Sequence, residues 1–522
     1  MSSESISATL AAIVGPDYVL TDEASCILYA QDVFTRDKTA ACVVQPETTE
    51  QLSRLVAAAV AAGFAVVPRG GGMSYTSGYV PEEDDSILVD TSRMDAVIAI
   101  NQEDMYVTVQ VGCSWKKLYE ALKDTGLRTP FWGPLSGFHA TVGGSISQSS
   151  VFFGAGLFGA SADSVVSLDV VLADGSVLST GSAAQKNGSP FFRHFGPDLT
   201  GLFTCDTGAL GIKSTITLRL MPEFKSIRHV SYDFDNYESQ IKALSEISRQ
   251  HLAAQMFGTD PGLGQIRAQR DSLMNDVKAL GGVLKAQDSL LGAVKQGAKI
   301  AMAGRRLVKN ASYPVHANVE ERCDAAADEV ADQIAAICQQ FGGKKIENSV
   351  PSIVRANPFN PLNNMVGPQG ERWVPVHALL PHSKVIESVK VTEAIYEKYS
   401  DMIEKHHIVT GFLFTTVSTN CFFMEPLWFW PDELNELHRE TVEGNVLAKQ
   451  KGFGANLEAR HAVESMRKEL VAAFSEMGAS HLQVGKEYIY RDGLKPEAFE
   501  LIKAIKAVVD PTRRINPGCL GL

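Results

Sequence analysis

Long apolar runs, paired cysteines and an excess of basic residues are all missing from this sequence of 522 residues. No run reaches the roughly 18 apolar residues that a membrane-spanning helix requires. The eight cysteines are scattered without a CxxC pair, so we expect neither a disulfide framework nor a zinc site. The N-terminal residues lack the basic stretch of a signal peptide. Reduced thiols and no export signal together predict a cytoplasmic protein.

The formal net charge of −12 argues against general nucleic-acid binding, which needs a basic surface to neutralise phosphates. Residues 283–310 depart from this balance, with six basic side chains and one acidic. A basic amphipathic helix can lie on an anionic membrane, but Gly292, Gly297 and Gly304 weaken a helix here. We therefore favour a solvated insertion, a lid or a subunit contact for this segment. We also expect a homo-oligomer, although no residue pattern sets the number of subunits.

The chain is too long for one hydrophobic core, because single cores stop growing near ~250–300 residues. Its first hundred residues alternate strand, helix, strand and loop, and Thr48 or Thr49 is suited to cap the helix that ends at Gly63. The composition changes after Met221-Pro222, where long helical patterns and an aromatic run at 412–430 begin. We expect an α+β protein with domains at 1–222 and 223–474 and a closing segment at 475–522.

Glycines cluster directly after a short apolar strand pattern that ends at Pro68. In Arg69-Gly-Gly-Gly-Met-Ser, the glycine amides are unshielded by side chains and can form a concave nest for an anion. A flexible turn is the alternative. The loop is not a Rossmann fingerprint, because that motif leads directly into a helix and this loop leads into another strand.

A second segment, 134–148, combines small residues, hydroxyl groups and bare amides, as the long polar spine of a dinucleotide needs. The order of all these segments is more specific than any one of them. P-R-G-G-G-x-S, a strand ending in VD, the T-V-G-G segment, LDVVLADGSVL and DLTGLFTCDTGALGIKSTITLRLMP together resemble the FAD-binding domain of the vanillyl-alcohol oxidase and p-cresol methylhydroxylase superfamily. DPTRRINPG near the C-terminus resembles the closing signature of that superfamily.

The resemblance covers roughly residues 40–222 and 475–520 and implies a two-domain flavoprotein. An N-terminal FAD-binding domain of two small α/β subdomains would lie beneath an α+β cap domain, whose antiparallel sheet covers the flavin. The closing segment would return to the FAD domain. The residues that the resemblance assigns to FAD are Pro68, Arg69, Gly70, Gly71, Gly72, Met73, Ser74, Pro134, Thr141, Val142, Gly143, Gly144, Ser147, Gly211, Ile212 and Asn516.

Several functional residues of better-known relatives are absent from the matching positions of this sequence. Met73 stands where relatives that attach FAD through this loop carry a histidine, so attachment here is excluded and attachment elsewhere stays open. The strand pattern at 411–430 has no histidine and GASHLQVGKEY has no Glu-His pair, so we expect no metal site. Ala160 falls where vanillyl-alcohol relatives have a catalytic aspartate, so their phenol site is not reproduced either.

Three side chains are candidates for the catalytic base. His481 lies in a segment that the resemblance places beside the flavin, His377 lies in RWVPVHALLPH, and Glu425 lies amid aromatic residues. A carboxylate or imidazole in such surroundings can accept a substrate proton. The alternatives are structural histidines and, for Glu425, a rim position or an ion pair with Arg355 or Arg372.

The aromatic run suggests the substrate. We expect Phe412, Phe414, Trp428 and Trp430 to line a flat apolar pocket, with a cap-domain core as the alternative. The predicted reaction is hydride transfer to flavin N5 from an aromatic or apolar alcohol, or from a para-alkylphenol. Dioxygen or an electron-carrier protein would then accept the electrons. The alternatives are a metal-independent D-2-hydroxy-acid dehydrogenase, in which Arg355 or Arg372 binds the carboxylate, and an inactive flavin-binding protein.

Overall fold

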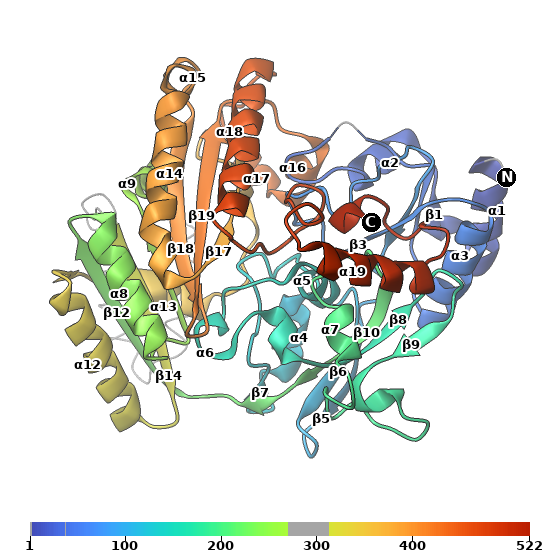
Figure 1. The fold of residues 1–522 in the computed structure, drawn as a ribbon, viewed down its shortest axis with the longest axis horizontal. Coiled ribbons are helices and arrows are strands. Elements are labelled where there is room, and N and C mark those ends of the chain that lie inside the picture. The colour runs from blue at the N-terminus through green and yellow to red at the C-terminus, as the bar shows by residue number, and fades with distance from the viewer. Residues whose placement is uncertain (1–2, 37, 270–312) are drawn as a thin grey trace.

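The computed structural model of this chain describes residues 3–36, 38–269 and 313–522. The basic segment 283–310 lies outside the described residues. Two domains lie side by side, with the C-terminal helix across one of them (Figure 1). Mixed helices and sheets confirm the predicted α+β class. No helix of the described ranges is long and apolar enough to cross a membrane.

The first sheet of the N-terminal domain carries the glycine loop at its edge. Its strands are β1 (Val19–Leu20), β2 (Cys42–Val44), β4 (Ile87–Asp90) and β3 (Val66–Arg69), in that order, with β2, β4 and β3 parallel. Helix α3 (Thr49–Ala61) connects β2 to β3 and is capped by the Thr48 hydroxyl, which accepts a hydrogen bond from the Gln51 amide. Gly63 follows the helix with φ +87°. The glycine loop begins where β3 ends.

The second sheet of this domain has the order β5 (Val97–Asn101), β6 (Tyr106–Gln110), β10 (Ile212–Arg219), β8 (Val165–Val171) and β9 (Val177–Ser179). All its pairs are antiparallel, so this subdomain is α+β and not the α/β unit that we expected. Two short strands, β7 (Leu127–Arg128) and β11 (Met221–Pro222), pair beside it. The chain then passes directly into the first strand of the cap.

The cap domain is built on one antiparallel sheet. The order is β15 (Lys344–Lys345), β12 (Ser226–Phe234), β14 (Tyr313–Glu321), β13 (Gln255–Thr259), β18 (Val409–Val417), β19 (Cys421–Trp430) and β16 (Arg372–Pro375), and β17 (Ala378–Leu380) also pairs with β19. The helices α8 (Tyr237–Arg249), α12 (Asp324–Gln340), α14 (Val385–Lys398) and α18 (Leu457–Glu476) pack on one face of this sheet (Figure 1). On its other face, α9 (Pro261–Gln269) packs against β18 and β19.

The closing segment returns to the N-terminal domain. Ile515 forms a parallel bridge with Val66 of β3, and α19 (Pro496–Val509) lies against this domain (Figure 1). The side-chain amide of Asn516 donates to the carbonyls of Gly78 and Thr207, at 2.8 Å each. The remaining helices are α1 (Ser3–Val14), α2 (Glu23–Tyr29), α4 (Trp115–Leu122), α5 (Val142–Gln148), α6 (Ala155–Phe158), α7 (Leu199–Leu202), α13 (Ser349–Ala356), α15 (Ser400–Lys405), α16 (Glu436–Thr441) and α17 (Gly444–Leu447).

Candidate active site

A large cavity lies between the N-terminal domain and the inner face of the cap sheet. Its empty volume is about 2030 Å³, including the part open to solvent. The glycine loop, the segment 134–152 and residues 207–213 line one half. Strands β18 and β19, helix α9 and Trp373 line the other half, and Leu482 and Gln483 come from the closing segment. All three parts of the chain therefore meet at this cavity.

The glycine loop packs tightly against the segment that follows it in the cavity wall. A Cβ atom on Gly71 would lie 2.0 Å from the carbonyl oxygen of His139, and one on Gly70 would lie 2.6 Å from Thr141 Oγ1. Gly72 has φ +72°, which side chains rarely adopt. Within the described residues, the amides of Gly70–Met73 donate no hydrogen bond. Since such donors are normally paired when shielded from water, this loop is suited to bind an anionic ligand.

The lining fits a dinucleotide well. Of the residues that the sequence assigned to FAD, all but Val142 and Asn516 line the cavity. Val142 is fully buried beneath the cavity lining. The side chain of Asn516 binds the carbonyls of Gly78 and Thr207 and so attaches the closing segment to the N-terminal domain. In the described part of the chain, the buried Arg69 Nε and Gln148 Oε1 have no hydrogen-bond partner, although both residues line the cavity. Such atoms are expected where a polar ligand completes the site.

The cap half of the cavity is apolar around one carboxylate. Successive inward residues of β19 are Phe423, Glu425, Leu427 and Phe429, and Leu413 of β18 is paired with Glu425. Leu263 and Ile266 of α9 close the apolar end. Glu425 is 9% exposed, and among the described lining residues it is the only charged group on this side. A buried carboxylate in this setting can accept a proton from a bound substrate.

The aromatic residues that we expected in the pocket lie on the opposite face of the sheet. Phe412, Phe414, Trp428 and Trp430 are buried in the core beneath α8, α14 and α18. Side chains alternate along a strand, so an error of one residue exchanges the two faces. Both faces of β19 are buried and apolar, which left the sequence without a polar face to fix the assignment. The alternative of a cap-domain core is therefore right for these four residues.

Neither candidate arginine lines the cavity. Arg355 donates to Glu320 at 2.8 Å and lies 4.5 Å above the ring of Trp132. Arg372 is fully buried, and its guanidinium donates to the carbonyls of Val33 and Phe34 at 2.9 and 2.8 Å. Burial lowers the pKa of Arg372 to about 10. Both side chains serve structural contacts, which corrects the expectation that they bind a substrate carboxylate.

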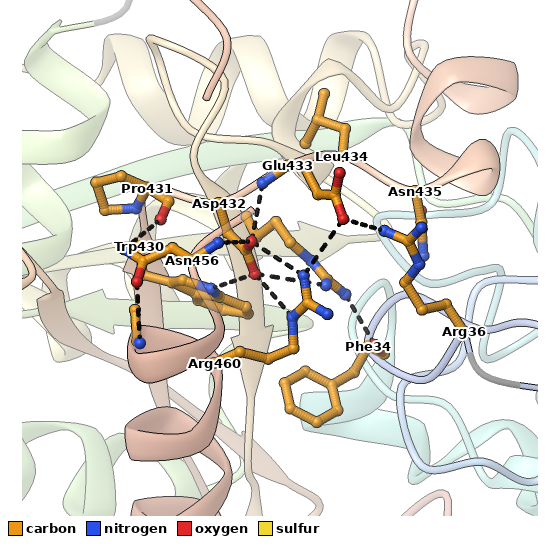
Figure 2. A network of polar contacts seen from close by, with 12 residues as sticks. Phe34, Arg36, Trp430, Pro431, Asp432, Glu433, Leu434, Asn435, Asn456 and Arg460 are labelled. Carbon is orange, nitrogen blue, oxygen red and sulfur yellow. Dashed lines mark hydrogen bonds and ion pairs between the residues drawn. The ribbon is translucent and has the colours of Figure 1, made fainter. Parts of the chain in front are cut away.

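Arg372 belongs to a polar network between the two domains. Figure 2 shows its centre, where Asp432 accepts hydrogen bonds from Trp430, Asn456 and Arg460. The neighbouring Glu433 pairs with Arg36 of the N-terminal domain at 2.9 Å. The network therefore joins the end of β19 to the loop that follows α2.

The two candidate histidines also lie outside the cavity lining. His377 is fully buried and its Nε2 donates to the Leu482 carbonyl at 2.7 Å, so its Nδ1 accepts from the Tyr488 hydroxyl at 2.9 Å. The Nδ1 atom of His481 donates to the His377 carbonyl at 2.8 Å, and its ring stacks on Tyr488. Burial lowers the pKa of both imidazoles, that of His377 to about 3. Their contacts hold the segment 480–488, so the structure favours the alternative of structural histidines.

Tyr75 and Gln483 are among the cavity residues that sequence reasoning missed. Tyr75 directly follows the glycine loop, and its hydroxyl lies 3.5 Å from Glu425 Oε2. Gln483 Nε2 lies 3.3 Å from the same hydroxyl. A polar aromatic residue next to a glycine loop gave a weak signal for Tyr75. Gln483 gave none, because its place depends on how the closing segment returns. In the described ranges, no three His, Cys, Asp or Glu side chains cluster as a metal site would require.

Comparisons with known proteins agree with this geometry. A family model described as an FAD binding domain matches residues 40–181. The glycolate oxidase subunit GlcD of Bacillus subtilis is 25% identical over 99% of this chain and 97% of its own length. D-Lactate dehydrogenase of Archaeoglobus fulgidus is 24% identical over 91% of this chain and 90% of its own. Among solved structures, p-cresol methylhydroxylase with bound substrate superposes with a TM-score of 0.74 at 17% identity, covering 99% of this chain and 96% of that one.

Proposed function

We propose that this chain, an FAD-dependent oxidoreductase with the fold of p-cresol methylhydroxylase, oxidises an aromatic or otherwise apolar alcohol. The observation that supports this substrate class is the cap half of the cavity. Its lining is mostly apolar, with Asn364 and Thr415 as uncharged polar members, and Glu425 is its one charged group among the described residues. An apolar wall excludes water and binds hydrocarbon, while a carboxylate accepts a hydrogen bond from a hydroxyl group.

Different groups of cavity-lining residues have different roles in the proposed reaction. The loop 68–74 and the residues around Thr141 would hold the polar spine of FAD. FAD supplies the acceptor for the hydride that leaves the substrate carbon. Glu425 accepts the hydroxyl proton, because it is the one of our three candidate bases that lines the cavity. Leu413, Leu427 and Phe429 hold the apolar part of the substrate against the sheet.

A D-2-hydroxy acid is the second candidate substrate. Similarity to a glycolate oxidase subunit and to D-lactate dehydrogenases, over nearly the whole chain, favours it. Its carboxylate would meet the like charge of Glu425, and no described cation lines the cap side to offset that repulsion. We therefore rank the neutral alcohol first. A cytoplasmic location, a homo-oligomeric state and the choice between dioxygen and a carrier protein as acceptor stay predictions.

An anaerobic screen tests the substrate class directly. Aromatic alcohols, para-alkylphenols, long-chain alcohols and D-2-hydroxy acids would be mixed with the purified protein while the flavin absorbance is followed. We expect bleaching with neutral alcohols or phenols and little with hydroxy acids. Bleaching by D-lactate or glycolate alone would refute the ranking, and no bleaching by any class would favour a protein that binds flavin without catalysis.

The Glu425→Gln variant tests the base. Glutamine keeps the shape but cannot take a proton, so flavin reduction by the best substrate should slow by about 10²-fold or more. Flavin content should not change. Glu393→Gln, an exposed position on α14, is the matched control and should reduce its flavin at the wild-type rate. A Glu425→Gln variant within a few-fold of wild type would remove this carboxylate from the mechanism.

A further inference from the structure

Tyr75 links the glycine loop to the cap domain. Its side chain is 7% exposed and lines the cavity. The ring packs edge-on against Trp373, with centroids 5.6 Å apart. Its backbone carbonyl accepts a hydrogen bond of 3.0 Å from Arg467 of α18. The position of the phenol group is therefore fixed from both domains.

The hydroxyl of Tyr75 lies between an amide and a carboxylate. Gln483 Nε2 donates to Tyr75 Oη at 3.3 Å, so the phenol proton is directed to Glu425 Oε2 at 3.5 Å. That second distance is at the outer limit for a hydrogen bond. An oxygen atom of a ligand that accepts from Tyr75 and donates to Glu425 would replace one weak contact with two ordinary ones.

Gln483 is held in an unfavourable backbone conformation to reach this place. Its φ is +46°, which is uncommon for a residue other than glycine. Its backbone N–H donates to the Gln148 carbonyl at 2.7 Å, and His377 binds the carbonyl of the preceding Leu482. In the described structure, the buried Gln483 Oε1 has no hydrogen-bond partner. Strained residues persist where the surrounding contacts over-determine them, and they gather at functional sites.

We propose that Tyr75 and Glu425 together bind the hydroxyl group of the substrate, with Tyr75 as a catalytic residue that donates to the substrate oxygen. This inference rests on the proposed function. In the reaction, the hydroxyl proton would pass to Glu425, and FAD, when bound, would supply the acceptor for the hydrogen that leaves the carbon with both electrons. The C–O single bond becomes the C=O bond of the product. The Tyr75 donor stabilises the negative charge that develops on oxygen as its proton leaves.

The chemistry of the pair selects a neutral hydroxyl group. A phenolate or a carboxylate has no proton to donate to Glu425 and is repelled by it. Burial raises the pKa of Tyr75 well above its ordinary value, and the nearby Glu425 adds to this, so the phenol keeps the proton that it donates. Gln483 keeps that proton directed toward the carboxylate.

A binding experiment tests the pair without any turnover. The probe is 4-nitrophenol, titrated into the flavin-loaded protein by calorimetry at several pH values. We expect affinity to fall as pH rises through the pKa of the probe, because the phenolate loses its donor. Tyr75→Phe should weaken binding by about 10-fold. Tyr396→Phe is the matched control, since this half-buried tyrosine of α14 does not line the cavity. Equal affinity in Tyr75→Phe and wild type, or preferred binding of the phenolate, would overturn the proposal.

Two further measurements separate catalysis from folding. With a substrate found in the anaerobic screen, Tyr75→Phe should reduce its flavin about 10²-fold more slowly, with unchanged flavin content. If Tyr75→Phe fails to fold, Gln483→Asn takes its place, since asparagine tolerates positive φ but is too short to reach Tyr75. It should weaken probe binding in the same direction, and wild-type affinity would count against the pair. If no alcohol reduces wild-type flavin, the proposed function fails, while the hydroxyl site is judged on binding of the probe.

Discussion

Gly71→Ala is the smallest change that tests the anion-binding role of the glycine loop. The added methyl carbon would lie 2.0 Å from the His139 carbonyl oxygen, whereas a relaxed C···O contact is about 3.3 Å. The glycine loop and the segment 134–148 must therefore move apart by about the difference between these two distances, which is more than ~1 Å. Backbone atoms stand on both sides of this contact, so no flexible side chain can relieve it.

The expected loss of FAD affinity follows from the donors that move. Hydrogen bonds from an amide to a charged phosphate contribute about 1.5–3 kcal/mol each. If two amides of Gly70–Met73 lose contact with the pyrophosphate, the loss is about 3–6 kcal/mol, or roughly 10²–10⁴-fold in affinity. The domain itself should stay folded, because overpacking typically costs only ~1–3 kcal/mol.

The assay is a titration of flavin-free protein with FAD, followed by the change in flavin fluorescence. Gly444→Ala is the matched control, because its Cβ would meet nothing within 4 Å and its backbone has no positive φ. The control should bind FAD as tightly as wild type. A Gly71→Ala protein that binds FAD within about threefold of wild type would show that this loop does not hold the cofactor.

Two other predictions concern stability. Asp432→Asn should lower the free energy of unfolding by about 3–5 kcal/mol, because it leaves the buried Arg372 and the nearby Arg460 without their carboxylate. Lys344→Ala, which removes an exposed ion pair, should change the free energy of unfolding far less. Urea unfolding measures both, and equal losses would contradict the interpretation. Burial lowers the pKa of His438 from 6.5 to about 3. Between these two pH values the unfolded chain binds a proton that the folded chain does not. The free energy of unfolding therefore falls as the pH is lowered below 6.5. His438→Gln should reduce this slope between pH 6 and 4 by up to about 1.4 kcal/mol per pH unit; unchanged slopes would show that another group is responsible.

The sequence determined those features that depend on local chemistry. Strand, glycine loop and strand follow from residues 66–90 alone, because bare amides and β-branched runs specify backbone conformation locally. Thr48 caps its helix as expected for the same reason. The order of the motifs also indicated the cofactor class, through the resemblance to a known FAD-binding domain that the family model over residues 40–181 supports.

The tertiary structure alone decided which side chains face the cavity. β19 is apolar on both faces, so only its packing beneath α14 and α18 shows that Glu425 points into the cavity and Trp428 away from it. The closing segment brings Gln483 to Tyr75 across 408 residues of sequence, and it turns His481 out of the lining. Such contacts depend on where distant elements pack, and no local pattern of residues encodes that.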